Sequence, residues 1–175
     1  HSQLAALPLT PKVIKDELIS AKNYFSYKER CLFCDIIHQE QKDKKRIVDE
    51  NADHIAFVPF ATKFPFEVSI MPKKHNADFR LESESSLKNV AQILKTSLSR
   101  IAKVLNDPPL NYILHTIPYL RSKPDYWKTI HSDFHWHIEI CPQVEEITGF
   151  ELGSGCHIQP LLPEICAKLL SGKTG

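Results

Sequence analysis

The sequence has no charge excess and no long apolar run. These two absences limit the kinds of partner that the protein can have. Its 22 basic and 21 acidic side chains give a net charge of +1, which provides no field to attract a polyanion. No apolar stretch approaches the roughly 18 residues that a membrane span needs, and no signal-peptide pattern opens the chain. We therefore expect neither a nucleic-acid partner nor a membrane partner. The 42% hydrophobic and 25% charged residues are typical of a globular domain.

The cysteines are odd in number, which argues against a disulfide framework. Two of the five cysteines form a C-x-x-C, and without a secretion signal this favours reduced thiols and a metal or redox site. We expect a cytoplasmic protein on this ground. The chain also begins with His1 rather than methionine, so we expect part of the natural protein to be missing from it. The cysteines are Cys31, Cys34, Cys141, Cys156 and Cys166.

Hydrophobic periodicity predicts a series of helices and strands. The clearest pattern is the apolar stripe of residues 86–105, which recurs at helical spacing and ends at N-D-P-P. The order of elements indicates an α+β fold with a mainly antiparallel sheet, and the long helix should bury its stripe against one face of that sheet. The expected helices are 11–28, a short one after Cys34, 86–105 and one beginning at Pro163. The expected strands are 46–51, 54–60, 65–72, 110–116 and 133–142.

The stretch D-F-H-W-H-I-E-I-C-P, residues 133–142, alternates polar and apolar side chains. Successive side chains of a strand point to opposite faces. One face would hold Asp133, His135, His137 and Glu139. The other, in the core, would hold Phe134, Trp136, Ile138 and Ile140. Two imidazoles on one face lie about 6 to 7 Å apart, which suits metal ligation or phosphate chemistry. The alternative is an exposed polar face of an antiparallel strand.

The C-x-x-C forms a metal-binding pattern with histidines further along the chain. Two thiolates and two imidazoles match the tetrahedral coordination of zinc, a borderline-soft ion. A thioredoxin-like redox pair is one alternative, but that motif follows a strand, whereas a predicted helix precedes Cys31. Two unrelated core cysteines are the other alternative. We predict a closed structural zinc site on Cys31, Cys34, His75 and His135.

Several short motifs resemble, in order and spacing, those of one enzyme family. They are H-S-Q-L-A-A-L-P-L-T-P-K, C-L-F-C-D-I-I, F-P-F-E-V-S-I-M-P-K-K-H, N-Y-I-L-H-T, F-H-W-H-I-E-I-C-P and G-F-E-L-G-S-G. Together they resemble the galactose-1-phosphate uridylyltransferases and the related ADP-glucose phosphorylases of the histidine-triad superfamily. The resemblance covers essentially all 175 residues and matches them to the second of two similar halves. It implies a histidine-triad-like fold. Residues 1–30, including a helix, would connect from a missing N-terminal half, and 31–175 would form the C-terminal domain.

The resemblance also implies roles for residues near both ends. His1 is similar to the family's nucleophile, which attacks the α-phosphorus of a nucleotide sugar and becomes a nucleotidyl-histidine. Gln3 is similar to the glutamine that hydrogen-bonds the phosphoryl oxygens. In the family, a glycine-containing stretch reaches the partner subunit's active site and touches the sugar phosphate, which implies a homodimer with shared active sites. The matching residues are Gly149, Phe150, Glu151 and Gly153.

The family has two metal patterns in its second half, and this sequence matches both. One pattern matches Cys31, Cys34, His75 and His135. The other uses a glutamate and three histidines and matches Glu17, His115, His135 and His137. We favour the cysteine set, because two thiolates bind zinc more strongly than a carboxylate does. Zinc is the expected cofactor, and a site on Glu17, His115 and His137 stays open as the alternative.

The activity that the resemblance implies is nucleotidyl transfer. A galactose-1-phosphate uridylyltransferase type of enzyme would act on a nucleotide sugar and a hexose 1-phosphate through a nucleotidyl-histidine. One alternative is a nucleoside-diphosphate-sugar phosphorylase, acting on ADP-glucose, on the same scaffold. Another is a non-catalytic, zinc-stabilised module for nucleotide binding or dimerisation. Because the first half of the family pattern is absent, we expect these 175 residues alone to be inactive.

Overall fold

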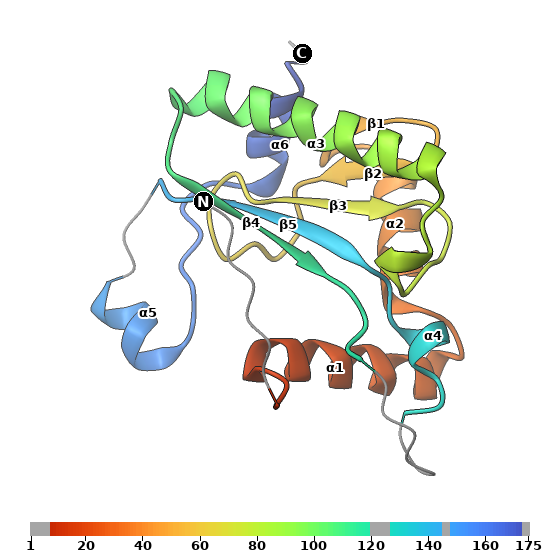
Figure 1. The fold of residues 1–175 in the computed structure, drawn as a ribbon. Helices are drawn as coiled ribbons and strands as arrows, with labels where there is room; N and C mark the ends of the chain where they lie inside the picture. Colours follow the sequence, from red (N-terminus) through yellow and green to blue (C-terminus); the bar gives the residue numbers. More distant parts are fainter. Residues whose placement is uncertain (1–7, 120–126, 145–147, 173–175) are drawn as a thin grey trace.

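The computed structural model describes residues 8–119, 127–144 and 148–172, and its strands form one antiparallel sheet (Figure 1). The strand order is β1-β2-β3-β5-β4, and every neighbouring pair is antiparallel. The predicted α+β class with a mainly antiparallel sheet is confirmed. The strands are β1 (Ile47–Glu50), β2 (His54–Phe57), β3 (Val68–Pro72), β4 (Leu110–His115) and β5 (His137–Pro142). The helices are α1 (Lys12–Lys28), α2 (Leu32–Asp43), the 3₁₀ helix η1 (Phe79–Leu81), α3 (Glu84–Leu105), α4 (Ile130–Asp133), α5 (Gly149–Ser154) and α6 (Pro163–Ser171).

The long helix α3 lies across one face of the sheet, as predicted (Figure 1). The hydroxyl of Ser83 caps its start by accepting a hydrogen bond from the amide of Ser86. The side chains that α3 buries recur every three or four positions, so one stripe faces the strands. With α6 this stripe closes a hydrophobic cluster over the sheet. The buried residues of α3 are Val90, Ile93, Ser97 and Ile101.

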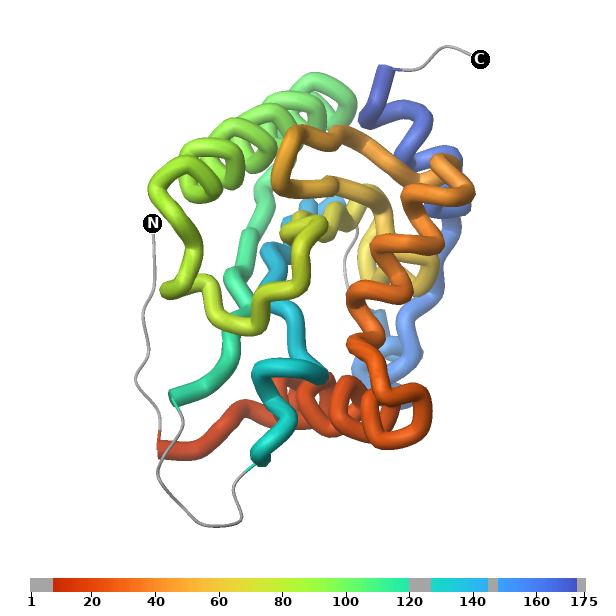
Figure 2. Tube along the Cα trace, turned by 90° about the vertical axis from the view of Figure 1, so that its right-hand side faces the viewer, coloured from red at the N-terminus to blue at the C-terminus, as the bar shows by residue number. Residues whose placement is uncertain are grey.

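Helices α1, α2 and α4 cover the opposite face through a second hydrophobic cluster. Figure 2 shows α1 and α3 on opposite sides of the strands. Because both faces are covered, β2 and β3 are buried along their whole length. The sheet is therefore the middle of three layers. No helix in the described part of the chain has the length and apolar character needed to cross a membrane.

The histidine stretch begins its strand later than predicted. Residues 130–133 form the short helix α4, so Asp133 lies in a helix and β5 starts only at His137. The amide of Trp136 donates to the carbonyl oxygen of Asn76 at 2.9 Å, which ties the chain to the loop after β3 before strand pairing begins. The predicted strand is therefore wrong over its first four residues.

This late start changes which side chains share a face. Phe134 packs in the cluster under α1 and α2, whereas Trp136 packs in the cluster under α3. The predicted common face for these two residues is wrong. His135 and His137 are both buried, so the alternative of an exposed polar face is wrong as well.

The third strand also starts late, at Val68 rather than 65. The carboxylate of Glu67 accepts hydrogen bonds from the amides of Lys63 at 2.9 Å and Phe64 at 3.3 Å. Phe66 adopts a positive φ of 62° within the same segment. The apolar residues before Val68 therefore belong to a turn that the Glu67 side chain stabilises, and not to the strand.

Candidate functional site

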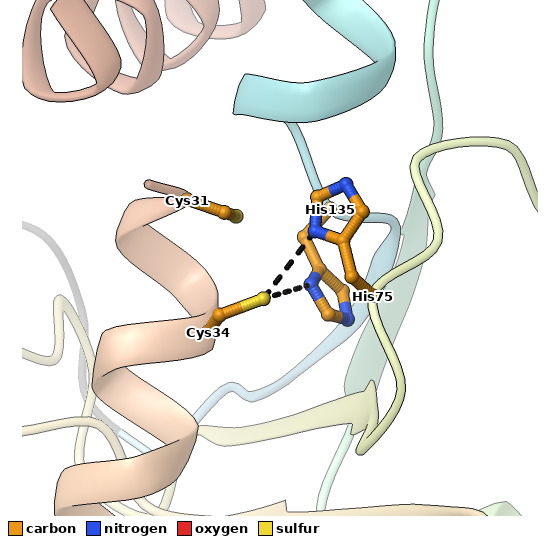
Figure 3. Close-up of side chains that lie close together, drawn as sticks. All are labelled: Cys31, Cys34, His75 and His135. Carbon is orange, nitrogen blue, oxygen red and sulfur yellow. Dashed lines mark hydrogen bonds between the residues drawn. The ribbon is translucent and has the colours of Figure 1, made fainter. Parts of the chain in front are cut away.

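Four potential metal ligands meet where α2 begins beside the loop after β3 (Figure 3). Cys31 is the N-cap residue of α2 and Cys34 lies one turn later, so both cysteines are on the same side of the helix. His75 comes from the loop after β3 and His135 from the residues just before β5. The ligand atoms of all four lie within 4.8 Å of one another. The structure thus brings together the four residues of the predicted zinc set.

The spacing of these atoms suits a tetrahedral ion. Cys34 Sγ is 3.3 Å from His75 Nδ1 and 3.6 Å from His135 Nδ1. Zinc bonds of about 2.3 Å to sulfur and 2.0 to 2.1 Å to nitrogen place these two kinds of atom about 3.6 Å apart at the tetrahedral angle. Two sulfurs and two nitrogens are also a common donor set of closed structural zinc sites. The residues present therefore fit zinc.

Hydrogen bonds from the Nε2 atoms orient the rings of His75 and His135. His75 Nε2 donates to the carbonyl oxygen of His131 at 2.9 Å, and His135 Nε2 donates to that of Pro72 at 2.8 Å. A carbonyl oxygen only accepts, so each neutral ring carries its proton on Nε2. The lone pair of each Nδ1 then points at Cys34. Metal-binding histidines are held in this way by a second group.

The two thiols hold their protons unequally. The hydrogen bond from Cys34 lowers the pKa of Cys31 to about 3, and the rings of His135 and His75 act in the same direction while burial opposes them. The same hydrogen bond raises the pKa of Cys34. Cys31 in turn raises the pKa of His75. Because a thiolate is the form that binds metal, the lowered pKa of Cys31 favours metal binding at this cluster.

A second cluster lies between α1 and the strands β4 and β5. The strand register places His115 opposite His137, with ring centroids 4.6 Å apart. Glu17 of α1 reaches both rings, because its Oε2 is 2.8 Å from His115 Nδ1 and its Oε1 is 3.2 Å from His137 Nε2. Glu139 is further away, at 3.7 Å from His115 and 3.8 Å from His137. The Glu17 carboxylate therefore links α1 to the sheet.

Burial and charge act differently on the two rings. Burial alone lowers the pKa of His115, but the hydrogen bond with Glu17 and the charges of Glu17 and Glu139 raise it overall. At His137 burial dominates and lowers the pKa. His137 Nδ1 donates to the carbonyl oxygen of His135 at 3.1 Å, so the neutral ring turns an unprotonated Nε2 toward Glu17. Glu17 Oε1 has no hydrogen-bond partner among the described groups. Two acceptors that face each other in this way attract a proton or a cation.

The two alternative ligand sets are separate in space. His135 directs Nδ1 to Cys34 and Nε2 to the carbonyl of Pro72, so both of its nitrogens are engaged in the cysteine cluster. The alternative set of one glutamate and three histidines is therefore not assembled as one group. The structure instead groups Glu17 with His115 and His137.

The residues expected to touch substrate lie away from both clusters or outside the described chain. Gly149, Phe150, Glu151 and Gly153 are in the short helix α5, where the Glu151 carboxylate caps the helix by accepting from Thr148. A Cβ added at either glycine would meet no atom within 4 Å, so no close contact among the described residues requires glycine there. His1 and Gln3 fall outside the described residues.

Phe33, between the two cysteines, is a site residue that the sequence did not reveal. Its ring stacks on His137 with centroids 5.2 Å apart and lies 6.3 Å from the ring of His135. It also packs edge-on against Phe134 at 5.6 Å. Phe33 therefore contacts a histidine of each cluster. An apolar residue inside a C-x-x-C has no pattern that distinguishes this role from ordinary core packing.

The comparisons with known sequences agree with one another. The family model described as galactose-1-phosphate uridyl transferase, C-terminal domain, matches residues 17–171. The ADP-glucose phosphorylase of Arabidopsis thaliana is 37% identical over 170 residues, which cover 97% of this chain and 46% of that protein. The galactose-1-phosphate uridylyltransferase of Thermotoga maritima is 27% identical over 177 residues, covering 97% of this chain and 53% of that protein. The chain thus spans about half the length of these relatives.

Solved structures show the same relationship. A crystal structure of the Arabidopsis thaliana ADP-glucose phosphorylase with bound ADP-glucose has a TM-score of 0.83 and 34% identity, covering 96% of this chain and 51% of that one. A zinc-bound histidine triad family protein from Mycobacterium smegmatis has a TM-score of 0.53 at 16% identity, covering 81% of this chain and 91% of that one. The second likeness concerns the fold alone. The predicted histidine-triad-like fold is confirmed.

Proposed function

The chain belongs to the galactose-1-phosphate uridylyltransferase family, whose C-terminal domain it matches, and we propose that it takes part in nucleotidyl transfer from a nucleotide sugar. The observation that carries the proposal is similarity along 97% of the chain to an ADP-glucose phosphorylase and to a galactose-1-phosphate uridylyltransferase. Because the chain spans about half of each relative, it would act as one part of a longer enzyme.

The proposed reaction has two displacements. A ring nitrogen of His1 attacks the α-phosphorus, a P–N bond forms, and the bond from that phosphorus to the bridging oxygen breaks. The sugar leaves as hexose 1-phosphate, and Gln3 hydrogen-bonds the phosphoryl oxygens. An acceptor oxygen then attacks the same phosphorus and releases the imidazole. The roles of His1 and Gln3 rest on the family resemblance.

Two acceptors distinguish the candidate activities. With hexose 1-phosphate as acceptor the enzyme is of the uridylyltransferase type, as the sequence analysis favours. With inorganic phosphate it is an ADP-glucose phosphorylase, and this second candidate is supported by the 37% identity to the Arabidopsis phosphorylase against 27% to the Thermotoga transferase.

The test is an assay of the full-length protein with each donor and acceptor pair. UDP-glucose with galactose 1-phosphate should yield UDP-galactose if the first candidate is right. ADP-glucose with phosphate should yield ADP if the second is right. Absence of product from every pair, with zinc-loaded and folded protein, would exclude both candidates and leave the non-catalytic module.

We also propose one zinc ion per chain, held by Cys31, Cys34, His75 and His135. The support is the fit of two sulfurs and two nitrogens with separations close to those of tetrahedral zinc. When bound, zinc would contribute folding free energy by joining α2 to the loop after β3 and to the start of β5. All four ligands come from the protein, so the site is proposed as structural.

A cytoplasmic homodimer with shared active sites is the remaining proposal. Free cysteines support a reducing compartment, since the described cysteines form no disulfide. Helix α5 supports the shared site, because Phe150 and Leu152 are exposed and its glycines leave open space around them. Apolar side chains on a projecting helix suit contact with a partner subunit.

A further inference from the structure

The two histidines of the cysteine cluster are each followed by a residue that hydrogen-bonds to one carboxylate. Asn76 follows His75, and Trp136 follows His135. Glu82 Oε1 accepts hydrogen bonds from Asn76 Nδ2 at 2.6 Å and from Trp136 Nε1 at 2.7 Å. A single oxygen atom therefore binds the chain neighbours of both histidines.

Asn76 and Trp136 are also joined to each other, and both side chains are held in place. The amide of Trp136 donates to the carbonyl oxygen of Asn76 at 2.9 Å. Asn76 Oδ1 accepts from the amide of Asp78 at 3.0 Å, so both polar atoms of this side chain are hydrogen-bonded. The ring of Trp136 is fully buried and packs edge-on against Phe79, with centroids 4.9 Å apart. The loop after β3 is thus fastened to the residues before β5.

Glu82 is itself fixed by the start of α3. It lies between η1 and α3, and its Oε2 accepts a hydrogen bond from the hydroxyl of Ser86 in the first turn of α3. Burial raises the pKa of Glu82, but the hydrogen bonds from Ser86 and from the two donors above lower it overall. An ionised carboxylate only accepts hydrogen bonds, and it accepts them more strongly than a neutral group does. Glu82 is therefore suited to hold several donors at once.

We propose that Glu82 is a positioning residue of the zinc site, which holds the segments carrying His75 and His135 in the arrangement that the ion needs. The two rings lie 5.2 Å apart at 86° to each other, and both direct Nδ1 to Cys34 (Figure 3). Trp136 packs in the cluster under α3, whereas the ligands meet beside α2. The inference rests on the proposed zinc site and extends its support to the opposite face of the sheet.

Ligands that are held in place before the ion binds should bind it more tightly. Binding must order any ligand segment that moves in the metal-free chain, and this ordering costs conformational entropy. Hydrogen bonds that fix the segments beforehand reduce that cost. Residues that orient metal ligands typically change metal affinity by about 10- to 100-fold. Because Glu82 acts through the residue after each histidine, we expect an effect near the lower end of this range.

The experiment is chelator competition for zinc on the folded 175-residue chain. Glu82→Ala removes the acceptor of both donors and should raise the zinc Kd by about tenfold. Glu82→Gln keeps one side-chain oxygen as acceptor and should raise the Kd less. Glu84→Ala is the matched control and should keep the wild-type Kd, since Glu84 is exposed in the first turn of α3 and pairs with Lys88 on the helix surface.

Urea unfolding with and without zinc separates positioning from a general effect on the fold. If Glu82 positions the ligands, Glu82→Ala should lose more unfolding free energy in the zinc-loaded protein than in the metal-free protein. The difference should be about 1.4 kcal/mol, which is the tenfold change in Kd expressed as free energy. If Glu82 only stabilises the fold, the two losses should be equal. Where Glu82→Ala does not fold without zinc, Glu82→Gln decides between these outcomes.

Amide hydrogen exchange tests the hydrogen-bonded link without any metal. In the metal-free protein, the amide of Trp136 should exchange faster in Glu82→Ala than in wild type, because its bond to Asn76 is no longer supported. The rate is compared with that of the β2 amides, which are buried in the middle of the sheet and report opening of the whole fold. Glu84→Ala should leave the ratio of the two rates unchanged.

The possible failures are distinguishable. A wild-type Kd in Glu82→Ala, equal losses of unfolding free energy in the two states, or an unchanged ratio of exchange rates would overturn the role of Glu82 and leave the zinc site in place. A wild-type chain that binds no zinc, or that binds it equally well after Cys34→Ser, would overturn the zinc site and this inference with it.

Discussion

Each histidine of the His135–His137 pair is oriented by the group that its second ring nitrogen meets. His135 gives Nε2 to the carbonyl of Pro72 and keeps Nδ1 for Cys34. His137 does the reverse, giving Nδ1 to the carbonyl of His135 and turning Nε2 toward Glu17. Because a carbonyl only accepts, the backbone selects the tautomer of each ring. Two histidines of one short stretch therefore serve two different clusters.

The first prediction tests which cluster holds zinc. Cys34→Ser and His135→Asn should each lose the ion and lower the thermal midpoint, because binding free energy at a structural site is folding free energy. Glu17→Gln is the matched control in the other cluster and should keep one zinc per chain. Elemental analysis and thermal unfolding measure both effects. Zinc lost from the Glu17 variant and kept in the Cys34 variant would reassign the metal to Glu17, His115 and His137.

The second prediction concerns His54, a fully buried ring whose Nδ1 has no hydrogen-bond partner among the described residues. Burial lowers its pKa, although Glu82 and Asp53 act against burial and Lys73 acts with it. The unfolded chain therefore binds a proton at His54 more readily, so this ring costs stability as pH falls below its ordinary value of about 6.5.

Urea unfolding at pH 7.5 and 5.5 measures this effect. The drop in unfolding free energy between the two pH values should be smaller in His54→Gln than in wild type. The control is His38→Gln, because His38 is exposed and zinc loss at low pH affects both variants equally. Equal drops in all three proteins would contradict the assignment.

At the scale of elements, local sequence patterns predicted the helices, whose bounds depend on residues close to one another in the sequence. The stripe of α3 and the proline that opens α6 gave nearly the observed helices. The start of β5 depends on a hydrogen bond from Trp136 to Asn76, and no local pattern encodes a contact between residues 60 positions apart. The four residues of the cysteine cluster could be predicted from their types. That His135 joins this cluster, whereas His137 faces Glu17, could not be predicted, because it depends on the late start of β5.

Helix α1 is fastened to the sheet by the Glu17 carboxylate, and the third prediction tests this contact. The pKa of His115 is raised in the folded state, so its pairing with Glu17 contributes to the free energy of unfolding. This contribution is complete below the ordinary histidine pKa of about 6.5 and is lost as pH rises through the higher pKa of the folded state. Glu17→Gln should lower the pKa of His115 and remove this pH-dependent stability, on the order of 1 kcal/mol for a charge-assisted hydrogen bond.

NMR titration of the His115 ring and unfolding between pH 5.5 and 8 measure the two effects of Glu17→Gln. The matched control is Glu84→Gln, since Glu84 is exposed in the first turn of α3 and pairs with Lys88 on the helix surface. A pKa of His115 that is unchanged by Glu17→Gln would show that another group raises it.

At the scale of the whole molecule, the described chain has two hydrophobic clusters and a candidate metal centre. The chain spans about half the length of the Arabidopsis phosphorylase and the Thermotoga transferase. The carboxylates of Glu17 and Glu139 lie beside His115 and His137, so the surroundings of His137 offer negative charge where a phosphate would need positive groups. This arrangement supports a nucleophile elsewhere than His137.

The last prediction follows from that charge distribution and concerns His1. In the full-length protein, His1→Asn should abolish turnover and leave folding and zinc content unchanged, because asparagine keeps polarity but cannot form a phosphoramidate. His137→Asn should lower activity only modestly. Incubation with a nucleotide sugar labelled at the α-phosphate, followed by peptide mapping, should place the label on His1. Label on His137 would reverse the assignment. Turnover without label on either histidine would mean direct transfer to the acceptor, so that the imidazole of His1 would have no covalent role.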